Sequence, residues 1–382
     1  MVGARPAEPR RWRRKSYVIR LADVSAQRTA PYSLDPKDIE FGRSCTPNFF
    51  ITEYRNGKWH DPRIEALHSF NLHPASNVFH YGQAIFEGLK AYRHPGDRLA
   101  LFRPAMNARR FDLSADRMGM PAVGEELFLE AIHRLVDVDR GFIPNPPGTL
   151  YIRPTMIGTE PMLGVRSSTE FIFYVLTLPS GAYFKEMASG TGTVRVFVEQ
   201  STSRAAPGGT GAVKAAANYA VTLKSIREAK QKGCSQVLFL DAIRRQRVEE
   251  LGGMNVFFVR DGELITPTLN GTILAGVTRD SLLKLGPSLG IPARELDIDI
   301  DQVVAELKTG RITEAIACGT AATVVGISEL VFGDGSVHRV GDGNLGPITK
   351  RLFDAIQAIQ FGTAPDRFGW VSQVQATAEV LS

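Results

Sequence analysis

The hydrophobic residues of this chain recur with two different spacings, which predicts a mixed α/β fold. Residues 171–176 are almost all aromatic or branched, and residues 236–240 and 312–317 are similar short apolar runs, so we expect three strands. Residues 219–232 have the spacing of a helix and are followed by a glycine. Residues 296–300 alternate between apolar and polar side chains, which predicts a further strand.

Proline and glycine divide this pattern into two parts. The string Pro-Ser-Gly at 179–181 interrupts the chain after the first predicted strand, so we expect an interdomain linker at 178–185. A chain of 382 residues that is 43% hydrophobic is long enough to bury two cores. We therefore expect a small α/β domain at 41–177 and a large domain at 186–382, preceded by a basic, flexible extension at 1–40.

Composition and charge argue against several classes of function. No apolar run reaches the length of a membrane span, and the first residues lack the apolar stretch of a secretion signal. The first 20 residues contain seven Lys or Arg and one Glu, so they account for the net charge of +5. We expect a solvated tail there and no nucleic-acid or membrane site. The three cysteines are widely spaced, without a metal-ligand pattern, and favour a reducing cytoplasmic location.

Lys214 is the strongest chemical signal in the sequence. It lies in residues 208–219, which read Gly-Gly-Thr-Gly-Ala-Val-Lys-Ala-Ala-Ala-Asn-Tyr. A lysine among small apolar residues can lose its proton and attack a carbonyl, which is the chemistry that pyridoxal phosphate requires of an enzyme. The same string also fits a flexible glycine loop with an exposed lysine before a helix. The local sequence leaves both interpretations open.

Three segments after Lys214 supply groups that such a cofactor needs. Glu249 and Glu250 follow a predicted strand, and one of them is expected to face the cofactor. Thr278 is suited to cap the helix-like run that follows it, where free N–H groups and the helix dipole favour an anion. Thr320 lies in the turn Cys-Gly-Thr-Ala after another predicted strand. Each segment alone is common, but their order behind Lys214 favours a pyridoxal enzyme.

With these residues the chain resembles the branched-chain amino acid aminotransferases, which belong to the class IV, fold type IV pyridoxal-phosphate enzymes. The resemblance extends over most of the chain after the first forty or so residues. It implies a two-domain fold with the cofactor in the interdomain cleft. The matching strings are FHYGQAIFEGLKAY at 79–92, LFRP at 101–104, LYIRP at 150–154, GAYF at 181–184, GVTR at 276–279, GTA at 319–321 and IQFG at 359–362, together with the Lys214 segment.

The resemblance also implies roles for individual residues. Lys214 would form a Schiff base with pyridoxal 5'-phosphate and then move the α-proton of the substrate. Glu250 would pair with the pyridine nitrogen and Tyr219 with the phenolic oxygen. The phosphate would be bound by Arg110, Val277, Thr278 and Thr320. The substrate pocket would be formed by Tyr81, Phe86, Tyr151, Arg153, Tyr183, Gly253 and Ala321, with Val165 reaching in from the neighbouring subunit of a homodimer. Plain core packing is the alternative for Phe86 and Tyr183.

The implied reaction is transamination between Leu, Ile or Val and 2-oxoglutarate by way of 2-keto acids, as in branched-chain amino acid biosynthesis. Arg153 is the candidate for binding the second carboxylate of glutamate. The same fold also hosts D-amino acid aminotransferases and aminodeoxychorismate lyase. The strings at 86–88 and 151–153 favour the branched-chain, L-specific group.

Several departures from the family pattern indicate a specialised paralogue as an alternative. Ala216 and Ala217 replace the usual glycines and are expected to crowd the cofactor or stiffen the helix start. Residues 45–48 read Cys-Thr-Pro-Asn in place of Phe-Thr-Asp-His, and Gly286-Pro287 is expected to break or kink its helix. Such a paralogue would handle allo-isoleucine or another non-protein amino acid, with a separate isomerase as partner. A second alternative is a scaffold that binds the cofactor without turnover.

Overall fold

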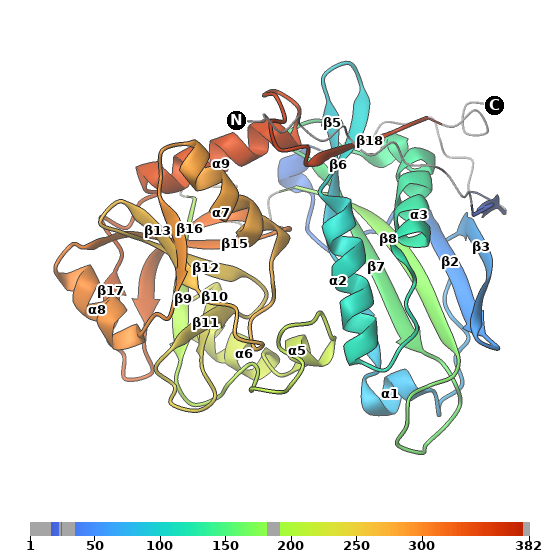
Figure 1. Ribbon diagram of the computed structural model, residues 1–382, viewed down its shortest axis with the longest axis horizontal. Helices are drawn as coiled ribbons and strands as arrows, with labels where there is room; N and C mark the ends of the chain where they lie inside the picture. The colour runs from blue at the N-terminus through green and yellow to red at the C-terminus, as the bar shows by residue number, and fades with distance from the viewer. Residues whose placement is uncertain (1–16, 23, 25–34, 182–191, 377–382) are drawn as a thin grey trace, which may run out of the picture.

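The chain folds into two mixed α/β halves that lie side by side (Figure 1). This arrangement is seen in a computed structural model, which describes residues 17–22, 24, 35–181 and 192–376. Within these residues the strands form two nine-stranded sheets, one in each half. We call the first sheet with helices α1 to α3 the first half, and the second sheet with helices α5 to α9 the second half.

The first sheet is built mainly from antiparallel neighbours in the order β1-β3-β2-β8-β7-β5-β6-β18, with β4 paired to β7. Its strands are β1 (Arg20–Leu21), β2 (Asn48–Arg55), β3 (Lys58–Ala66), β4 (Ala84–Phe86), β5 (Leu89–His94), β6 (Arg98–Phe102), β7 (Thr149–Gly158), β8 (Phe171–Ser180) and β18 (Val371–Val374). The accompanying helices are α1 (Asn77–Tyr81), α2 (Pro104–Arg117) and α3 (Glu125–Val138), with 3-10 turns at Pro36–Asp38 and Arg140–Phe142.

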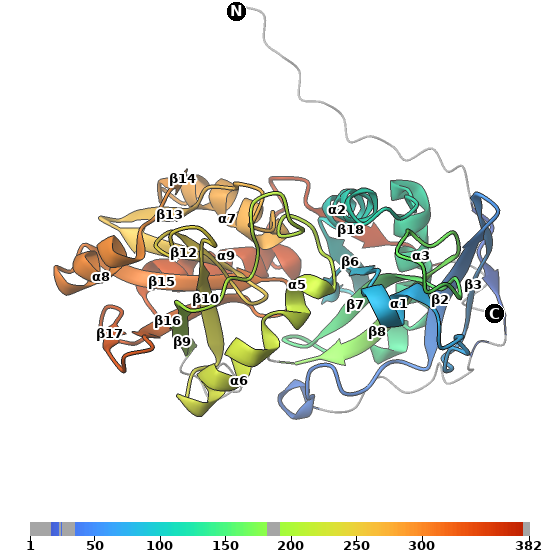
Figure 2. The ribbon, with the colours of Figure 1, turned by 90° about the horizontal axis from the view of Figure 1, so that it is seen from below.

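The second sheet has the order β11-β10-β9-β16-β15-β12-β13-β14, with β17 paired to β16. Its strands are β9 (Thr193–Glu199), β10 (Gln236–Leu240), β11 (Val248–Leu251), β12 (Asn255–Arg260), β13 (Glu263–Pro267), β14 (Ala293–Leu296), β15 (Ile312–Gly319), β16 (Thr323–Val331) and β17 (Val337–Arg339). The helices are α5 (Ala217–Ala220), α6 (Leu223–Gln231), α7 (Val277–Ser288), α8 (Ile300–Lys308) and α9 (Pro347–Gln360). Figure 2 shows α5 between the two sheets.

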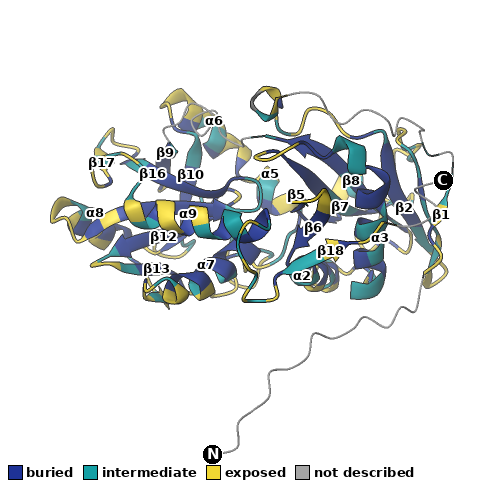
Figure 3. Cartoon of the chain, turned by 90° about the horizontal axis from the view of Figure 1, so that it is seen from above, coloured by how far each residue is buried: buried dark blue, intermediate teal, exposed yellow. Residues whose placement is uncertain are grey.

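Each half has its own apolar core. In the first half, α2 and α3 pack on the sheet through Phe111 and Phe128, whose ring centroids are 5.3 Å apart, and both rings contact Phe173 of β8. Burying one such ring contributes about 1.5–3 kcal/mol. In the second half, α8 covers one face of the sheet and α7 with α9 cover the other. The central strands of both sheets are accordingly buried, while α9 exposes its outer side (Figure 3).

A third cluster joins the two halves. Tyr92 and Phe102 of the first sheet pack with side chains of α7 and α9 and with Trp370. After α9 the chain crosses back to the first half, where β18 pairs antiparallel with β6. The sequence placed all of 186–382 in the second domain, so the structure differs from that boundary at the C-terminal strand. Strand β18 has only four residues, which is too short to carry a periodic pattern.

The predicted strands at 171–176, 236–240 and 312–317 are confirmed as β8, β10 and β15. Strand β8 continues to Ser180, and therefore extends into the predicted linker at 178–185. The strand predicted at 296–300 is wrong, because Leu296 ends β14 and Ile300 begins α8. Asp299 caps α8 by accepting hydrogen bonds from the N–H groups of Asp301 and Gln302. The end of β14, the cap residue Asp299 and the first residue of α8 together place apolar and polar side chains in turn, as a half-buried strand would.

The predicted helices also differ in detail. The helix predicted at 219–232 is divided, because α5 ends at Ala220 and α6 begins at Leu223. Helix α7 is capped by Gly276 and not by Thr278, which lies one residue inside the helix. Pro287 does not break α7 early, since it occupies the last turn and the helix ends at Ser288. Pro287 has no N–H group to bond the carbonyl four residues earlier, and α7 continues for only one residue beyond it.

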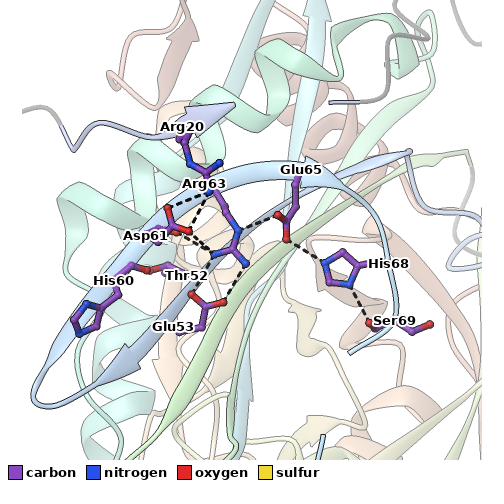
Figure 4. A network of polar contacts seen from close by, with 9 residues as sticks. All are labelled: Arg20, Thr52, Glu53, His60, Asp61, Arg63, Glu65, His68 and Ser69. Atoms are coloured by element: carbon purple, nitrogen blue, oxygen red, sulfur yellow. Dashed lines mark hydrogen bonds and ion pairs between the residues drawn. The ribbon is translucent and has the colours of Figure 1, made fainter. Parts of the chain in front are cut away.

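The β2–β3 hairpin carries a network of ion pairs centred on Arg63 (Figure 4). Its guanidinium is 3.1 Å from Glu53, 2.9 Å from Glu65 and 3.3 Å from Asp61. Asp61 also pairs with Arg20 of β1 at 3.1 Å, so the network ties the short edge strand to the sheet.

Among the described residues, no helix is both long and apolar enough to cross a bilayer.

Candidate active site

A pocket lies between the two halves of the molecule. Most of its lining comes from the second half: the loop before α5, the β11–β12 turn, the start of α7 and the end of β15. Helix α2 of the first half contributes Arg110. Lys214, Tyr219, Glu250, Thr278 and Thr320 all line this pocket, so the fold brings these sequence-predicted residues together.

The loop that carries Lys214 is held rigidly against the first half. The N–H of Phe86 donates to the carbonyl of Lys214 at 3.1 Å, and the N–H of Lys214 donates to Ser114 Oγ of α2 at 3.0 Å. Within the loop, Asn218 Nδ2 donates to the carbonyls of Thr210 and Val213 at 2.7 and 2.8 Å. These bonds fix the backbone on both sides of Lys214, so its amine enters the pocket from a defined position.

The Lys214 amine lies among aromatic groups. Its Nζ donates to the Tyr219 hydroxyl at 2.7 Å and lies 4.8 Å from the centroid of the Phe86 ring. The Phe86 and Tyr219 rings are themselves 4.7 Å apart. The replacements Ala216 and Ala217 lie outside the pocket lining, and Ala216 has ordinary helical torsion angles. The expectation that they crowd the pocket finds no support in this geometry.

Arg110 is bound by a carboxylate that we did not assign from the sequence. Its Nε and one terminal nitrogen donate to the two oxygens of Glu87 at 2.7 and 2.9 Å, and the other terminal nitrogen donates to the Ala275 carbonyl at 2.9 Å. Asn107 Nδ2 adds a bond of 2.8 Å to Glu87. Burial alone would raise the pKa of Glu87, but the charge and hydrogen bonds of Arg110 hold it below its ordinary value.

Glu250 lies at the opposite side of the site on β11. One oxygen contacts the Arg204 guanidinium and accepts from the Leu274 N–H at 3.0 Å, and the other accepts from Asn255 Nδ2 at 3.2 Å. Burial raises the pKa of Glu250 to about 7, although the charge of Arg204 opposes the rise. The sequence did not indicate Arg204, because it precedes Lys214 by ten residues and belongs to no recognisable motif.

The first turn of α7 forms the third side of the pocket. The leading N–H groups of a helix have no intrahelical partner, so Val277 and Thr278 present donors at the positive end of the helix dipole. Gly276 is required here, since a Cβ atom at this position would lie 2.0 Å from Asn255 Oδ1. Cys318 and Thr320 line the pocket opposite. Burial raises the pKa of the Cys318 thiol to about 12, so the thiol stays protonated.

The residues expected to bind substrate fall into two groups. Phe86, Tyr151 and Arg153 lie together: the Arg153 guanidinium carbon is 4.7 Å from the Phe86 ring centroid, and one of its nitrogens donates to the Tyr151 hydroxyl at 3.0 Å. None of these three residues belongs to the pocket lining, although the centroid of the Phe86 ring lies 4.8 Å from Lys214 Nζ. Tyr81 and Val165 also lie outside the lining, and they are 40% and 88% exposed. The remaining members are Gly253, which lines the pocket, Ala321, which follows Thr320, and Tyr183, which lies outside the described residues.

Comparisons with known proteins agree with this geometry. A family model described as amino-transferase class IV matches residues 84–330. The chain belongs to the class IV amino-transferases. Branched-chain-amino-acid transaminase 1 of Bacillus subtilis is 45% identical to it over 342 residues, which cover 89% of this chain and 95% of that protein. A probable branched-chain-amino-acid aminotransferase of Streptomyces coelicolor is 44% identical over 340 residues, covering 87% and 91%.

Solved structures give the same result. The branched-chain amino acid aminotransferase of Escherichia coli matches with a TM-score of 0.69 at 28% identity, covering 85% of this chain and 99% of that one. The T.th. branched-chain amino acid aminotransferase, solved with pyridoxamine 5'-phosphate, matches with a TM-score of 0.69 at 27% identity, covering 85% and 98%. The fold of this class IV amino-transferase is therefore shared with enzymes that bind a pyridoxal-type cofactor.

The donor set of the pocket fits pyridoxal phosphate. A class IV amino-transferase needs an amine, an acceptor for the proton of the pyridine nitrogen and a site for a phosphate. The pocket offers Lys214, the buried carboxylate of Glu250, and the start of α7 beside the Thr320 hydroxyl. Across the described residues, no cluster of His, Cys, Asp or Glu is arranged to hold a metal ion.

Lys90 is a further ionisable residue of this class IV amino-transferase, and it lies where the two halves of the molecule meet. It lies on β5 with only 6% of its surface exposed, and its Nζ donates to the Ala321 carbonyl at 2.6 Å. Burial lowers the pKa of this amine to about 8. Lys90 therefore connects the first sheet to the turn that contains Thr320. Its apolar neighbours in sequence gave no sign of this contact.

The free energy of unfolding of the wild type should increase between pH 8 and 10.5 because of Lys90. We predict that Lys90→Met removes this increase. Because the pKa of Lys90 is about 8 in the folded protein and 10.5 ordinarily, the unfolded chain binds more protons between these values. The free energy of unfolding of the wild type therefore gains a contribution as the pH rises from 8 towards 10.5, and the variant lacks it. Urea unfolding of the cofactor-free protein at pH 7.5, 8.5 and 9.5 measures the difference. The exposed Lys224→Met is the control, and a difference independent of pH would contradict the prediction.

Proposed function

We propose that this protein transfers amino groups between branched-chain L-amino acids and 2-oxoglutarate, with pyridoxal 5'-phosphate attached to Lys214. The observation that carries the proposal is the convergence of Lys214, Tyr219, Glu250 and the start of α7 on one pocket of a class IV amino-transferase. The relatives named above support the choice of branched-chain substrates. The products of the two half-reactions are 2-keto acids.

Lys214 is proposed as the amine that holds the cofactor and then moves the proton. Bound pyridoxal phosphate supplies an aldehyde for a covalent bond to an amine and a ring that accepts electrons from the α-carbon of the substrate. Once an amino acid has displaced it, the Lys214 amine removes the α-proton and later returns a proton at the end of the half-reaction. Phe86 and Tyr219 keep the amine in position and exclude water from it.

Glu250 and Tyr219 are proposed to hold the cofactor ring. The carboxylate of Glu250 would accept a hydrogen bond from the protonated pyridine nitrogen, which keeps that nitrogen positively charged and able to attract electrons. The bonds from Leu274 and Asn255 fix both oxygens of Glu250, so the carboxylate does not need to reorient. The Tyr219 hydroxyl, which already accepts from Lys214, would donate to the phenolic oxygen of the ring.

The phosphate is proposed to lie between α2 and α7. The N–H groups of Val277 and Thr278 and the hydroxyl of Thr320 would donate to it. The charge of Arg110 faces the same space, and its bonds to Glu87 and Ala275 hold the guanidinium beside the first turn of α7. In that arrangement Arg110 contributes as a fixed positive charge and is already satisfied in its hydrogen bonds.

The substrate side of the pocket is proposed to be completed by a second subunit. Phe86, Tyr151 and Gly253 offer apolar surface for a branched side chain, while Arg153 offers a cation for the second carboxylate of 2-oxoglutarate. Tyr81 holds the 160s loop by donating to the Leu163 carbonyl, and the apolar side chains of that loop are exposed. In a homodimer, Val165 of this loop would enter the neighbouring pocket. Tyr183 and Ala321 remain expected members of the site.

Absorbance spectroscopy of the protein with bound cofactor tests the substrate assignment. L-leucine, L-isoleucine, L-allo-isoleucine, L-glutamate and D-alanine are added separately, and conversion of the cofactor to its amine form is followed. Branched L-amino acids and L-glutamate are expected to convert it, and D-alanine is not. Conversion by D-alanine alone would identify a D-amino acid aminotransferase. Absence of conversion by every amino acid would favour a lyase or an inactive paralogue and refute the proposal.

Replacing Lys214 by alanine is predicted to abolish turnover. The loss should be at least about 1,000-fold, because both the covalent attachment and the proton transfer are removed. Cofactor binding through the phosphate and the ring nitrogen should survive, as measured by equilibrium dialysis with pyridoxal phosphate. Lys224→Ala, on the exposed side of α6, is the matched control and should keep full activity. An active Lys214→Ala variant would remove Lys214 from its assigned role.

Glu250→Gln is predicted to slow α-proton removal on the order of 100-fold, since an amide cannot hold the pyridine nitrogen in its charged state. The rate is measured in a single half-reaction with L-leucine. The control is Glu249→Gln, because Glu249 is equally buried but alternates to the other face of β11, where it contacts Thr272. Equal half-reaction rates for Glu250→Gln and the wild type would eliminate the proposed pairing.

A further inference from the structure

Arg103 joins the two halves of the molecule directly at helix α7. It precedes α2, and its guanidinium donates to Ser281 Oγ at 2.6 Å and to Asp280 Oδ2 at 2.5 Å. Both partners belong to the N-terminal part of α7. A longer contact of 3.5 Å reaches the carbonyl of Val277, the first residue of that helix. The side chain of Arg103 is only 8% exposed and that of Asp280 is 33% exposed, so the pair is partly shielded from water.

The backbone of Arg103 is held in a strained conformation. Its φ is 51° and its ψ is 42°, in the left-handed region that favours glycine. A residue with a side chain costs about 1–3 kcal/mol in such a conformation unless its surroundings compensate. A glycine would avoid the strain but would lose every contact with α7. The side-chain contacts therefore account for an arginine at this position.

Arg103 and Arg110 both form hydrogen bonds to the start of α7, and both belong to α2 or its N-cap. Arg103 is the N-cap residue of α2, and Arg110 lies seven residues further along it. Arg110 donates to the carbonyl of Ala275, immediately before the cap residue Gly276, whereas Arg103 binds the turn that follows. The two arginines therefore hold the segment that contains the N–H groups of Val277 and Thr278 at two points fixed to the first half.

The C-terminal segment supports the same contact. The Arg103 N–H donates to the Trp370 carbonyl at 2.7 Å, and the guanidinium carbon lies 4.8 Å from the centroid of the Trp370 ring. Trp370 is stacked on Phe368 with a centroid distance of 4.1 Å, which limits its movement. Arg103 is therefore anchored through its backbone and through the aromatic face beneath its charge.

We propose that Arg103 is a positioning residue for the phosphate of the cofactor: it sets the first turn of α7 against α2, so that the helix N–H groups and Arg110 face one anion. This inference rests on the proposed function, because it requires a phosphate at that place. Arg103 does not itself line the pocket, so it acts through α7. Its loss should weaken ligands that carry the phosphate and should spare ligands that lack it.

The test compares pyridoxal 5'-phosphate with pyridoxal, which has the same aldehyde and ring but no phosphate. Both are titrated into the cofactor-stripped full-length protein, and dissociation constants are read from absorbance and from quenching of tryptophan fluorescence. Arg103→Gln is expected to weaken pyridoxal phosphate at least about tenfold, as befits the loss of a charged hydrogen bond, and to leave pyridoxal within about twofold. Arg103→Lys, which keeps the charge, should recover part of the loss.

Variants of the α7 residues that bind Arg103 keep the test informative if the Arg103 variants fail to fold. Asp280→Asn and Ser281→Ala remove the partners of Arg103 from α7 and should show the same selective loss to a smaller degree. His94→Gln is the matched control, because His94 makes a different buried contact between the halves, to the Gln360 carbonyl at 2.9 Å. It should lower the melting temperature without changing the ratio of the two dissociation constants.

Arg110→Gln separates failure of this inference from failure of the proposed function. Suppose that Arg110→Gln weakens the binding of pyridoxal phosphate selectively, whereas the Arg103 and Asp280 variants weaken the binding of both ligands equally or of neither. Arg103 then only holds the two halves together, and the inference is overturned. If Arg110→Gln shows no selectivity either, the phosphate does not lie between α2 and α7. That result would overturn the phosphate assignment and this inference together.

Discussion

The ion pair between Glu87 and Arg110 is the interaction on which the pocket depends. Glu87 has no exposed surface, so its charge is stable only because Arg110 and Asn107 bond both of its oxygens. Removing one partner of such a pair typically costs about 3–5 kcal/mol, because the other charge is left buried and unpaired. Since Arg110 also bonds Ala275, the same pair links the first half to the loop before α7.

A second buried ion pair, between Arg204 and Glu250, lies at the opposite side of the pocket. Arg204 contacts Glu250 and also donates to the carbonyls of Gly211 and Thr272 at 3.1 and 2.7 Å. It therefore joins the Lys214 loop, the loop before α7 and the carboxylate on β11. Both acidic groups of the pocket are thus fixed by arginines before any ligand is present. This reduces the reorganisation that binding a charged cofactor would otherwise require.

Much of the chemistry, but little of the support around it, was predictable from the sequence. Lys214 and the turns at Thr278 and Thr320 were found because glycine-rich strings and helix starts have local signatures. Glu87 and Lys90 were visible only within a matching string, and Arg204 was not indicated. Their roles depend on contacts between segments far apart in the chain, and no local period encodes such contacts.

The same limit applies to the fold. Central strands such as β10 were found because nearly every residue in them is apolar, whereas the sequence at 296–300 mixes a strand end with a helix cap. Two of the departures from the family pattern also lie away from the pocket lining. Ala216 and Ala217 lie outside its lining, and Asn48 bonds the buried Asp139 in the first half at 2.8 Å.

The return of the chain to the first sheet has a consequence for how the molecule is made. Strand β6 receives its partner β18 only when residues 371–374 are available, after the whole second half has been synthesised. Until then β6 is an open edge, with unpaired N–H and C=O groups that invite association with other chains. The edge of the first sheet at β6 is therefore covered only late in synthesis, after the chain has returned from the second half.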